Sequence, residues 1–171
     1  MFKNIKNSSN LFIIFTENDT KIILNELIKK HTKDDIYLFV NNENIFLYDK
    51  LLSNLNIFNE YCKNTIKLLF DMREKTYKEM PNHKFKHKHL ILDNYLIENY
   101  DVKTIKNILL LHTKYNLSLY IITKDVNIQK FIYNVSNYII IDKNLFYVFM
   151  KNNKINDDNL SEYKDYYIMK V

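Results

Sequence analysis

Asp93 is the residue best placed to do chemistry, because it ends a short apolar run at residues 90–92. A carboxylate at the carboxyl end of a buried strand can hold a Mg²⁺ ion, since Mg²⁺ prefers oxygen ligands. The next residue, Asn94, stands where a second acid would activate water, and an amide is no base at neutral pH. The pattern indicates a metal ligand, and it leaves open the alternative that Asp93 only caps the turn after its strand.

Lys21 follows the first apolar run, where a phosphate-binding loop would lead into a helix. Such a loop needs glycine-rich backbone and a helix N-terminus that carries Lys followed by Ser or Thr. When the motif G-x-x-x-x-G-K-[ST] is laid over this stretch, only the lysine is kept, because Phe15, Thr20 and Ile22 replace the glycines and the hydroxyl. Asp19, Thr20 and Lys21 are the candidate nucleotide contacts, and an ordinary helix start is the alternative for Lys21.

Thr123 ends another apolar run, residues 117–123. If this strand neighbours the Asp93 strand, a polar side chain at its carboxyl end can sense the γ-phosphate of a bound nucleotide. The alternative is an ordinary strand end at the surface. Asp93 and Thr123 are therefore the candidate catalytic residues.

The sequence contains no glycine. Glycine is needed where the backbone takes a positive φ or where a phosphate approaches it closely. Another residue there costs ~1–2 kcal/mol, and its Cβ obstructs the phosphate. We therefore predict that no position of this chain requires a positive φ and that efficient nucleotide hydrolysis is absent. The shortage of residues with GC-rich codons indicates an AT-rich genome.

A basic loop before the Asp93 strand carries Lys84, Lys86 and Lys88, the candidate nucleic-acid contacts. Lysines bind phosphates, interleaved aromatic rings stack on bases, and the net charge of +5 permits such a partner. Lysine codons of an AT-rich gene explain the same charge without any partner. The loop's imidazoles, at His83, His87 and His89, lack the constraint of a usual zinc site and are expected to belong to a solvated or phosphate-contacting loop.

The apolar runs alternate with amphipathic patterns, which predicts a single α/β domain over residues 1–171 with a mostly parallel central sheet flanked by helices. The predicted strands are residues 11–15, 36–40, 90–92, 117–123 and 138–141. Helices are predicted to begin near residue 21, to run from about 60 to 79, to follow Asp101, and to form one or two short pieces within 45–58. Residues 1–10 are expected to be a flexible start and 143–171 a strand pair made by 146–149 and 166–169.

Composition excludes several other classes of protein. With 47% hydrophobic residues the chain suits a globular fold, and no apolar run reaches the ~18 residues that a membrane span needs. We expect no membrane partner and no signal peptide. The only cysteine, Cys62, cannot form an internal disulfide, which fits a reducing, cytoplasmic compartment.

A longer pattern surrounds the candidate residues. The run from His89 to Asn94 is followed by a helical stretch, by Tyr115-Asn116 before the strand that ends in Thr123, and by Ser136-Asn137 before the next strand. This succession resembles the poxvirus-type virion DNA-packaging ATPases of the FtsK/HerA group of P-loop NTPases. The resemblance extends over about residues 11–142. The departures from the family's pattern are Asn94, Thr113, Lys114 and Lys124.

The resemblance implies a RecA-like fold, ATP and Mg²⁺ as cofactors, and ancestry in a ring-shaped translocase of double-stranded DNA. It implies that Lys21 holds the phosphates, that Asp93 holds the metal, and that Thr123 is the sensor. Arg73, the only arginine, is the one candidate for an arginine finger. A viral source would place the protein in the host cytoplasm or a virus factory.

Because the departures fall on the chemistry, we expect a degenerate member, a pseudoenzyme of viral or plasmid-type DNA packaging or virion assembly. It would act as a homo-oligomer or beside an active ATPase partner. One alternative is an active but divergent ATPase and DNA translocase. The other is a non-catalytic structural or nucleic-acid-binding protein on a decayed fold, in which Phe15 and Ile22 fill the former pocket.

Overall fold

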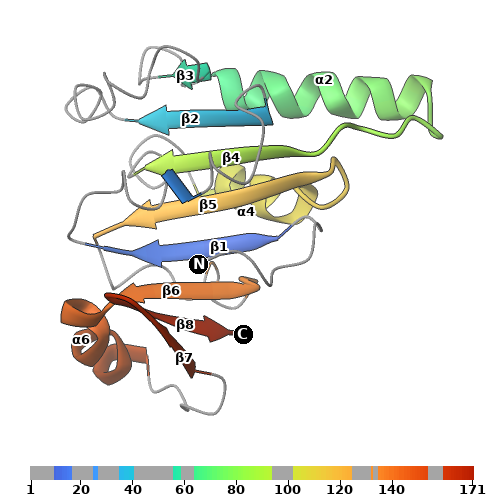
Figure 1. Ribbon diagram of the computed structural model, residues 1–171. Helices are drawn as coiled ribbons and strands as arrows, with labels where there is room; N and C mark the ends of the chain where they lie inside the picture. The colour runs from blue at the N-terminus through green and yellow to red at the C-terminus, as the bar shows by residue number, and fades with distance from the viewer. Residues whose placement is uncertain are drawn as a thin grey trace.

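One sheet of eight strands organises the part of the chain that the structure describes, in the order β3-β2-β4-β5-β1-β6-β8-β7 (Figure 1). This computed structural model describes residues 10–16, 25–26, 35–40, 56–58, 64–93, 102–124, 132, 135–153 and 160–171. The strands are β1 (Leu11–Phe15), β2 (Ile36–Val40), β3 (Asn56–Phe58), β4 (Lys88–Asp93), β5 (Leu117–Thr123), β6 (Tyr138–Asp142), β7 (Leu160–Tyr163) and β8 (Tyr166–Lys170). The described helices with assigned bounds are α2 (Thr65–Glu79), α4 (Val102–Leu111) and α6 (Lys143–Asn153).

The strands from β1 to β6 run parallel to one another, and β8 is antiparallel to both β6 and β7. This confirms the predicted α/β fold with a mostly parallel sheet, and every predicted strand before residue 143 is present. The central strands are mostly apolar because both faces of a parallel sheet are covered. All residues of β1 and β5 are buried accordingly.

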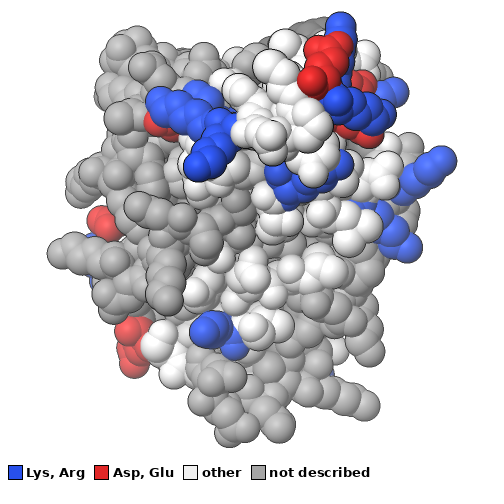
Figure 2. Space-filling view, turned by 90° about the vertical axis from the view of Figure 1, so that its right-hand side faces the viewer, with Lys and Arg blue, Asp and Glu red and all other residues white. Residues whose placement is uncertain are grey.

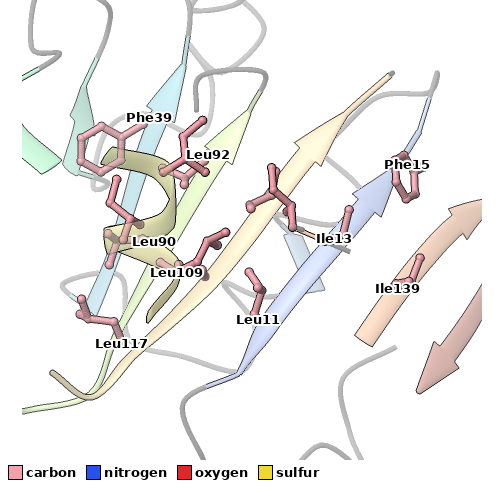
Figure 3. Close-up of a cluster of buried hydrophobic side chains, with 14 of the residues drawn as sticks. Leu11, Ile13, Phe15, Phe39, Leu90, Leu92, Leu109, Leu117 and Ile139 are labelled. Carbon is pink, nitrogen blue, oxygen red and sulfur yellow. The ribbon is translucent and has the colours of Figure 1, made fainter. Parts of the chain in front are cut away.

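Alternate residues of each strand build two separate cores. On one face Leu11, Ile13 and Phe15 of β1 join Leu90 and Leu92 of β4 and Leu109 of α4 (Figure 3). Side chains of α2 and α6 belong to the same core. On the other face the core contains Phe12, Ile14, Ile91, Tyr120 and Ile122. The face of the sheet to which a residue points is therefore fixed by its place in the strand.

Two element predictions were wrong. Residues 146–149, predicted as a strand, lie within α6, since four apolar residues in a row do not distinguish a strand from a helix. Asp142 begins this helix: its Oδ1 accepts a hydrogen bond from the backbone N–H of Asn144 at 3.0 Å. The closing strand pair is instead β7 with β8. Residues 56–58, assigned to a short helix, form β3 beside β2.

The prediction that no residue needs a positive φ is also wrong. Among the described residues Asn116 has φ 55° and Lys164 has φ 52°. Asparagine visits this left-handed region more readily than most residues, so a chain without glycine has a substitute for it. Lys164, in the turn between β7 and β8, has no such preference.

None of the helices that the structure describes is long and apolar enough to cross a membrane.

Candidate functional site

The carboxyl ends of β4, β5, β1 and β6 lie in a row, which we call the carboxyl edge (Figure 1). Asp93 is the last residue of β4 and is level with Ile122 of β5. Thr123 ends β5 level with Phe15 of β1, and the backbone N–H of Thr16 donates to the carbonyl of Thr123 at 3.1 Å. The structure thus brings both predicted catalytic residues to one edge of the sheet.

Asp93 and Thr123 lie on opposite faces of the sheet. Asp93 shares its face with Ile122, whereas Thr123 shares the other face with Phe15. Both are buried, with exposed fractions of 2% and 4%. Thr123 is therefore no surface strand end, the alternative considered from sequence, and its side chain lies on the face of the sheet opposite to that of Asp93.

Two further polar residues at the carboxyl edge escaped prediction as site residues. Thr16 follows directly on β1, Asp142 is the last residue of β6, and both are 1% exposed. The signal was present in the sequence, since each is the first polar residue after an apolar run. Asp142 has an evident structural role as the cap of α6. Thr16 extends β1 toward the predicted phosphate loop.

The ends of the strands fit a magnesium–nucleotide site only in part. The carboxylate of Asp93 is a suitable Mg²⁺ ligand. Phe15, in the place of the motif's first glycine, is instead a fully buried sheet residue whose ring lies 5.0 Å from that of Phe149 in α6. Under the decayed-fold alternative, the Phe15 ring was expected to fill the former nucleotide pocket. The structure places this ring in the core between the sheet and α6. Asp19, Thr20, Lys21, Ile22 and Asn94 lie outside the described residues.

The predicted nucleic-acid loop lies at the opposite, amino edge of the sheet. Both Lys86 and Lys88 form ion pairs with Oδ1 of Asp35, at 2.8 and 3.0 Å. The Lys88 side chain is 17% exposed, and its ammonium also lies 5.4 Å from the centre of the Tyr37 ring. Lys84 and Lys86 are the exposed lysines of this loop. Figure 2 looks onto this side of the molecule and shows basic side chains in separate groups rather than in one patch.

Arg73 cannot serve as an arginine finger in this conformation. It is 9% exposed, and its guanidinium donates a hydrogen bond to the carbonyl of Tyr115 and lies 5.0 Å from the centre of the Phe85 ring. Burial lowers the pKa of Arg73, while the nearby Tyr37 opposes this shift. The side chain fastens α2 to the turn before β5.

The loop histidines do not form a metal centre. Within the described part of the chain no group of His, Cys, Asp and Glu is arranged to hold a metal ion. The rings of His87 and His89 are stacked, with centroids 4.8 Å apart. His83 packs edge-on against Phe85. Cys62 lies outside the described residues.

The strand order and the position of Asp93 define the class of fold. The described strands form a mostly parallel sheet in which β5 separates β1 from β4, the strand that ends in Asp93, and this is an α/β, RecA-like fold of the kind found in P-loop NTPases. Two solved structures of one protein share it, those of the genome packaging NTPase B204 from Sulfolobus turreted icosahedral virus 2.

The complex of B204 with ATP-gammaS has a TM-score of 0.50 and 14% sequence identity, and the match covers 81% of this chain and 75% of that one. The complex with sulfate has a TM-score of 0.51 and 15% identity, with 80% and 75% covered. No model of a protein family and no curated protein matches the sequence. At this identity the likeness concerns the fold.

Proposed function

We propose that this chain is a degenerate DNA-packaging-ATPase-like protein that acts in viral or plasmid-type DNA packaging or virion assembly without efficient ATP hydrolysis. The observation that carries the proposal is the buried carboxylate of Asp93 at the end of β4, one strand removed from β1. This is where a P-loop NTPase holds its magnesium ion. The solved structures of similar fold belong to a genome packaging NTPase, and one of them contains ATP-gammaS.

Loss of catalysis is supported by two features around that carboxylate. Asn94 replaces the acid that would activate water, and a positioned general base contributes typically 10²–10⁴-fold to a rate. Phe15 occupies the first glycine position as an ordinary strand residue, so the phosphates have no glycine turn at the end of β1. The residual role of the site is weak nucleotide binding, in which Asp93 holds Mg²⁺ and Lys21 holds the phosphates.

Calorimetric titration of the full chain with ATP and Mg²⁺, together with phosphate release, tests this proposal. We expect weak binding that Lys21→Ala and Asp93→Asn reduce at least tenfold, and phosphate release no faster than the background without protein. Lys151→Ala, which changes an exposed lysine of α6, is the control and should bind as the unmodified chain does. Turnover that Asp93→Asn abolishes would establish the active, divergent ATPase instead. Absence of any binding would leave the structural alternative.

The substitution Asn94→Glu separates two forms of the proposal. If the missing base alone limits hydrolysis, this variant should recover turnover by the factor that a general base contributes. Because the glycines are missing as well, we expect no recovery. A rise of a hundredfold over the parent chain would contradict the idea that the phosphate loop has decayed.

Double-stranded DNA is the partner that we propose, with an active ATPase or further copies of this chain in the same assembly. Lys84 and Lys86 are the exposed loop lysines that can contact phosphates, whereas the Lys88 side chain is only 17% exposed. Lys86, like Lys88, is paired with Asp35, and a DNA phosphate would compete with that carboxylate. Each phosphate contact lowers the slope of log K against log salt by about 0.9. The double variant Lys84→Glu/Lys86→Glu should therefore weaken DNA binding and flatten this slope by about two units. If it retains DNA as well as Lys151→Glu does, the loop is not the DNA contact.

A further inference from the structure

The outward side of α2 carries a row of charged side chains. Residues four positions apart on a helix form a ridge, and helices pack against each other through such ridges. One ridge of α2 alternates in sign along its length, and all its members are exposed. We call it the charged ridge, and it consists of Lys67, Asp71, Lys75 and Glu79. Within the helix its charges stabilise one another only weakly, since the exposed ammonium of Lys75 lies 3.9 Å from the carboxylate of Glu79.

The ridge beside it is apolar. Leu68 and Met72 are 58% and 69% exposed, although the opposite side of α2 belongs to the core. The hydroxyl of Thr76, the next residue of this ridge, donates to the carbonyl of Met72 at 3.0 Å and is therefore satisfied within the helix. Met80, exposed directly after the helix, continues the line. A continuous apolar row rimmed by charges marks a surface that packs against a partner, whereas single exposed apolar residues do not.

The order of the charges selects the partner. Read backwards, the series plus, minus, plus, minus becomes its own complement. A second copy of α2 that runs antiparallel and crosses the first at position 73 therefore places Lys67 opposite Glu79 and Asp71 opposite Lys75. A two-fold axis forms each of these pairs twice. A parallel copy would put like charges opposite each other, and the phosphates of a nucleic acid would meet the carboxylates of Asp71 and Glu79.

We propose that two copies of this chain associate through the outward sides of their α2 helices, antiparallel and about a two-fold axis. Leu68 and Met72 of each copy then pack against the aliphatic stems of Lys75 and Lys78 of the other. Because an isologous interface occupies the same patch on both copies, assembly through α2 ends at two. With one helix from each copy the interface is small, so its dissociation constant is weaker than about 1 µM.

The dimer is independent of the nucleotide chemistry. No residue of the two ridges belongs to the carboxyl edge, so pairing leaves the strand end at Asp93 as it is in the single chain. For the further copies that the proposed function invokes, this pairing requires neither ATP nor DNA. Failure of the dimer would leave the outcome of the ATP titration unchanged, and absence of nucleotide binding would leave the dimer intact.

Sedimentation velocity of the full chain at rising concentration, without nucleotide, tests the proposal. We expect a monomer–dimer equilibrium and no larger species up to about 500 µM. Asp71→Lys and Lys75→Glu each turn two attractive pairs into repulsive ones and should raise the dissociation constant at least about tenfold. Lys151→Glu makes the same charge change on α6 and should associate as the parent chain does. A chain that stays monomeric, assembles beyond two copies or tolerates both reversals would overturn the proposal.

A mixture of the two single variants separates this geometry from a general effect of charge. In a mixed dimer the new lysine at position 71 of one chain faces the new glutamate at position 75 of the other, while the unchanged Lys75 faces the unchanged Asp71. We expect mixed dimers about as tight as those of the parent, and the double variant Asp71→Lys/Lys75→Glu should regain self-association for the same reason. Circular dichroism checks that each variant keeps its helices. If neither the mixture nor the double variant recovers association, the helices do not pair in this register and the proposal is wrong.

Discussion

The two edges of the sheet differ in how their polar residues are used. At the amino edge, hydrogen bonds hold separate segments together: Arg73 binds the carbonyl of Tyr115, and the Asn116 amide binds that of Phe85 at 2.8 Å. At the carboxyl edge, buried polar residues such as Asp93 and Thr123 end the strands, beside a first glycine position occupied by the core residue Phe15. The amino edge is built for stability, whereas the carboxyl edge gathers the buried polar residues on which the proposed function rests.

The residues that carry the resemblance to packaging ATPases divide along the same line. Asn137 clamps the start of β1: its side-chain oxygen accepts the N–H of Leu11 at 2.7 Å, and its own N–H donates to the Leu11 carbonyl at 2.9 Å. Tyr115 and Asn116 connect α4 to β5. The matching residues at the amino edge thus have structural roles, whereas the departure at Asn94 follows directly on the carboxyl edge. The residues that maintain the fold are therefore different from those that the proposed loss of hydrolysis concerns.

The largest effect is expected from Arg73→Met, which removes the charged anchor of the amino edge. It leaves the buried carbonyl of Tyr115 without its donor and should lower the free energy of unfolding by roughly 2–4 kcal/mol, measured by urea denaturation. Lys75→Met on the same helix, where the side chain is 77% exposed, is the control and should change it by less than about 0.5 kcal/mol. Equal effects would remove the distinction between a buried anchor and an ordinary helix cation.

Asn116→Ala is the next largest test of the amino edge. The variant loses both the tolerance for φ 55° and the bond to Phe85, each worth about 1 kcal/mol, so we expect a loss of about 2 kcal/mol in unfolding free energy. Asn116→Gly keeps the backbone conformation and should lose about half as much. If alanine and glycine cost the same, the left-handed conformation is not what the asparagine supplies.

The sequence predicted the parallel sheet well because its strands are long apolar runs with polar ends, and it located Asp93 at the correct edge for the same reason. It did not predict the opposite faces of Asp93 and Thr123, which depend on the register between β4 and β5. The roles of Arg73 and of His87, whose Nε2 lies 2.9 Å from the Ser118 hydroxyl, also escaped prediction, since each joins segments that are distant in sequence. The strand predicted at residues 146–149 was wrong because four consecutive apolar residues show neither the two-residue period of a strand nor the 3.6-residue period of a helix.

Acid should weaken the amino edge through His112, at the end of α4. Its Nδ1 bonds to the Leu109 carbonyl at 2.6 Å, and burial lowers its pKa more than this bond raises it. The unfolded chain, with a histidine pKa of about 6.5, then binds more protons than the folded one as pH falls below that value. Stability should fall by up to about 1.4 kcal/mol per pH unit in this window and should not change above it.

Urea midpoints measured between pH 7.5 and 5.5 check this dependence. The contribution of His87, whose pKa burial also lowers, has the same sign. His112→Phe removes one titrating group and should flatten the slope while lowering stability at pH 7.5, because the bond to Leu109 is lost. A slope that stays the same in this variant would mean that the acid sensitivity arises elsewhere, for example at the carboxylates of the other edge.

The smallest effect is expected at Lys164, the second residue with a left-handed backbone. It lies at the carboxyl edge, whereas Asn116 lies at the amino edge. Lys164 has φ 52° in the turn between β7 and β8, beside the carboxyl end of β6, and the Asp165 carbonyl in the same turn accepts the N–H of Lys143 at 2.9 Å. Lys164→Asn should relieve part of the strain and raise the free energy of unfolding by roughly 0.5 kcal/mol. Lys164→Ala, which keeps a Cβ without the asparagine preference, should give no gain. A gain in the alanine variant would point to the charge of Lys164 rather than to its backbone, and the turn would then provide no counterpart to Asn116.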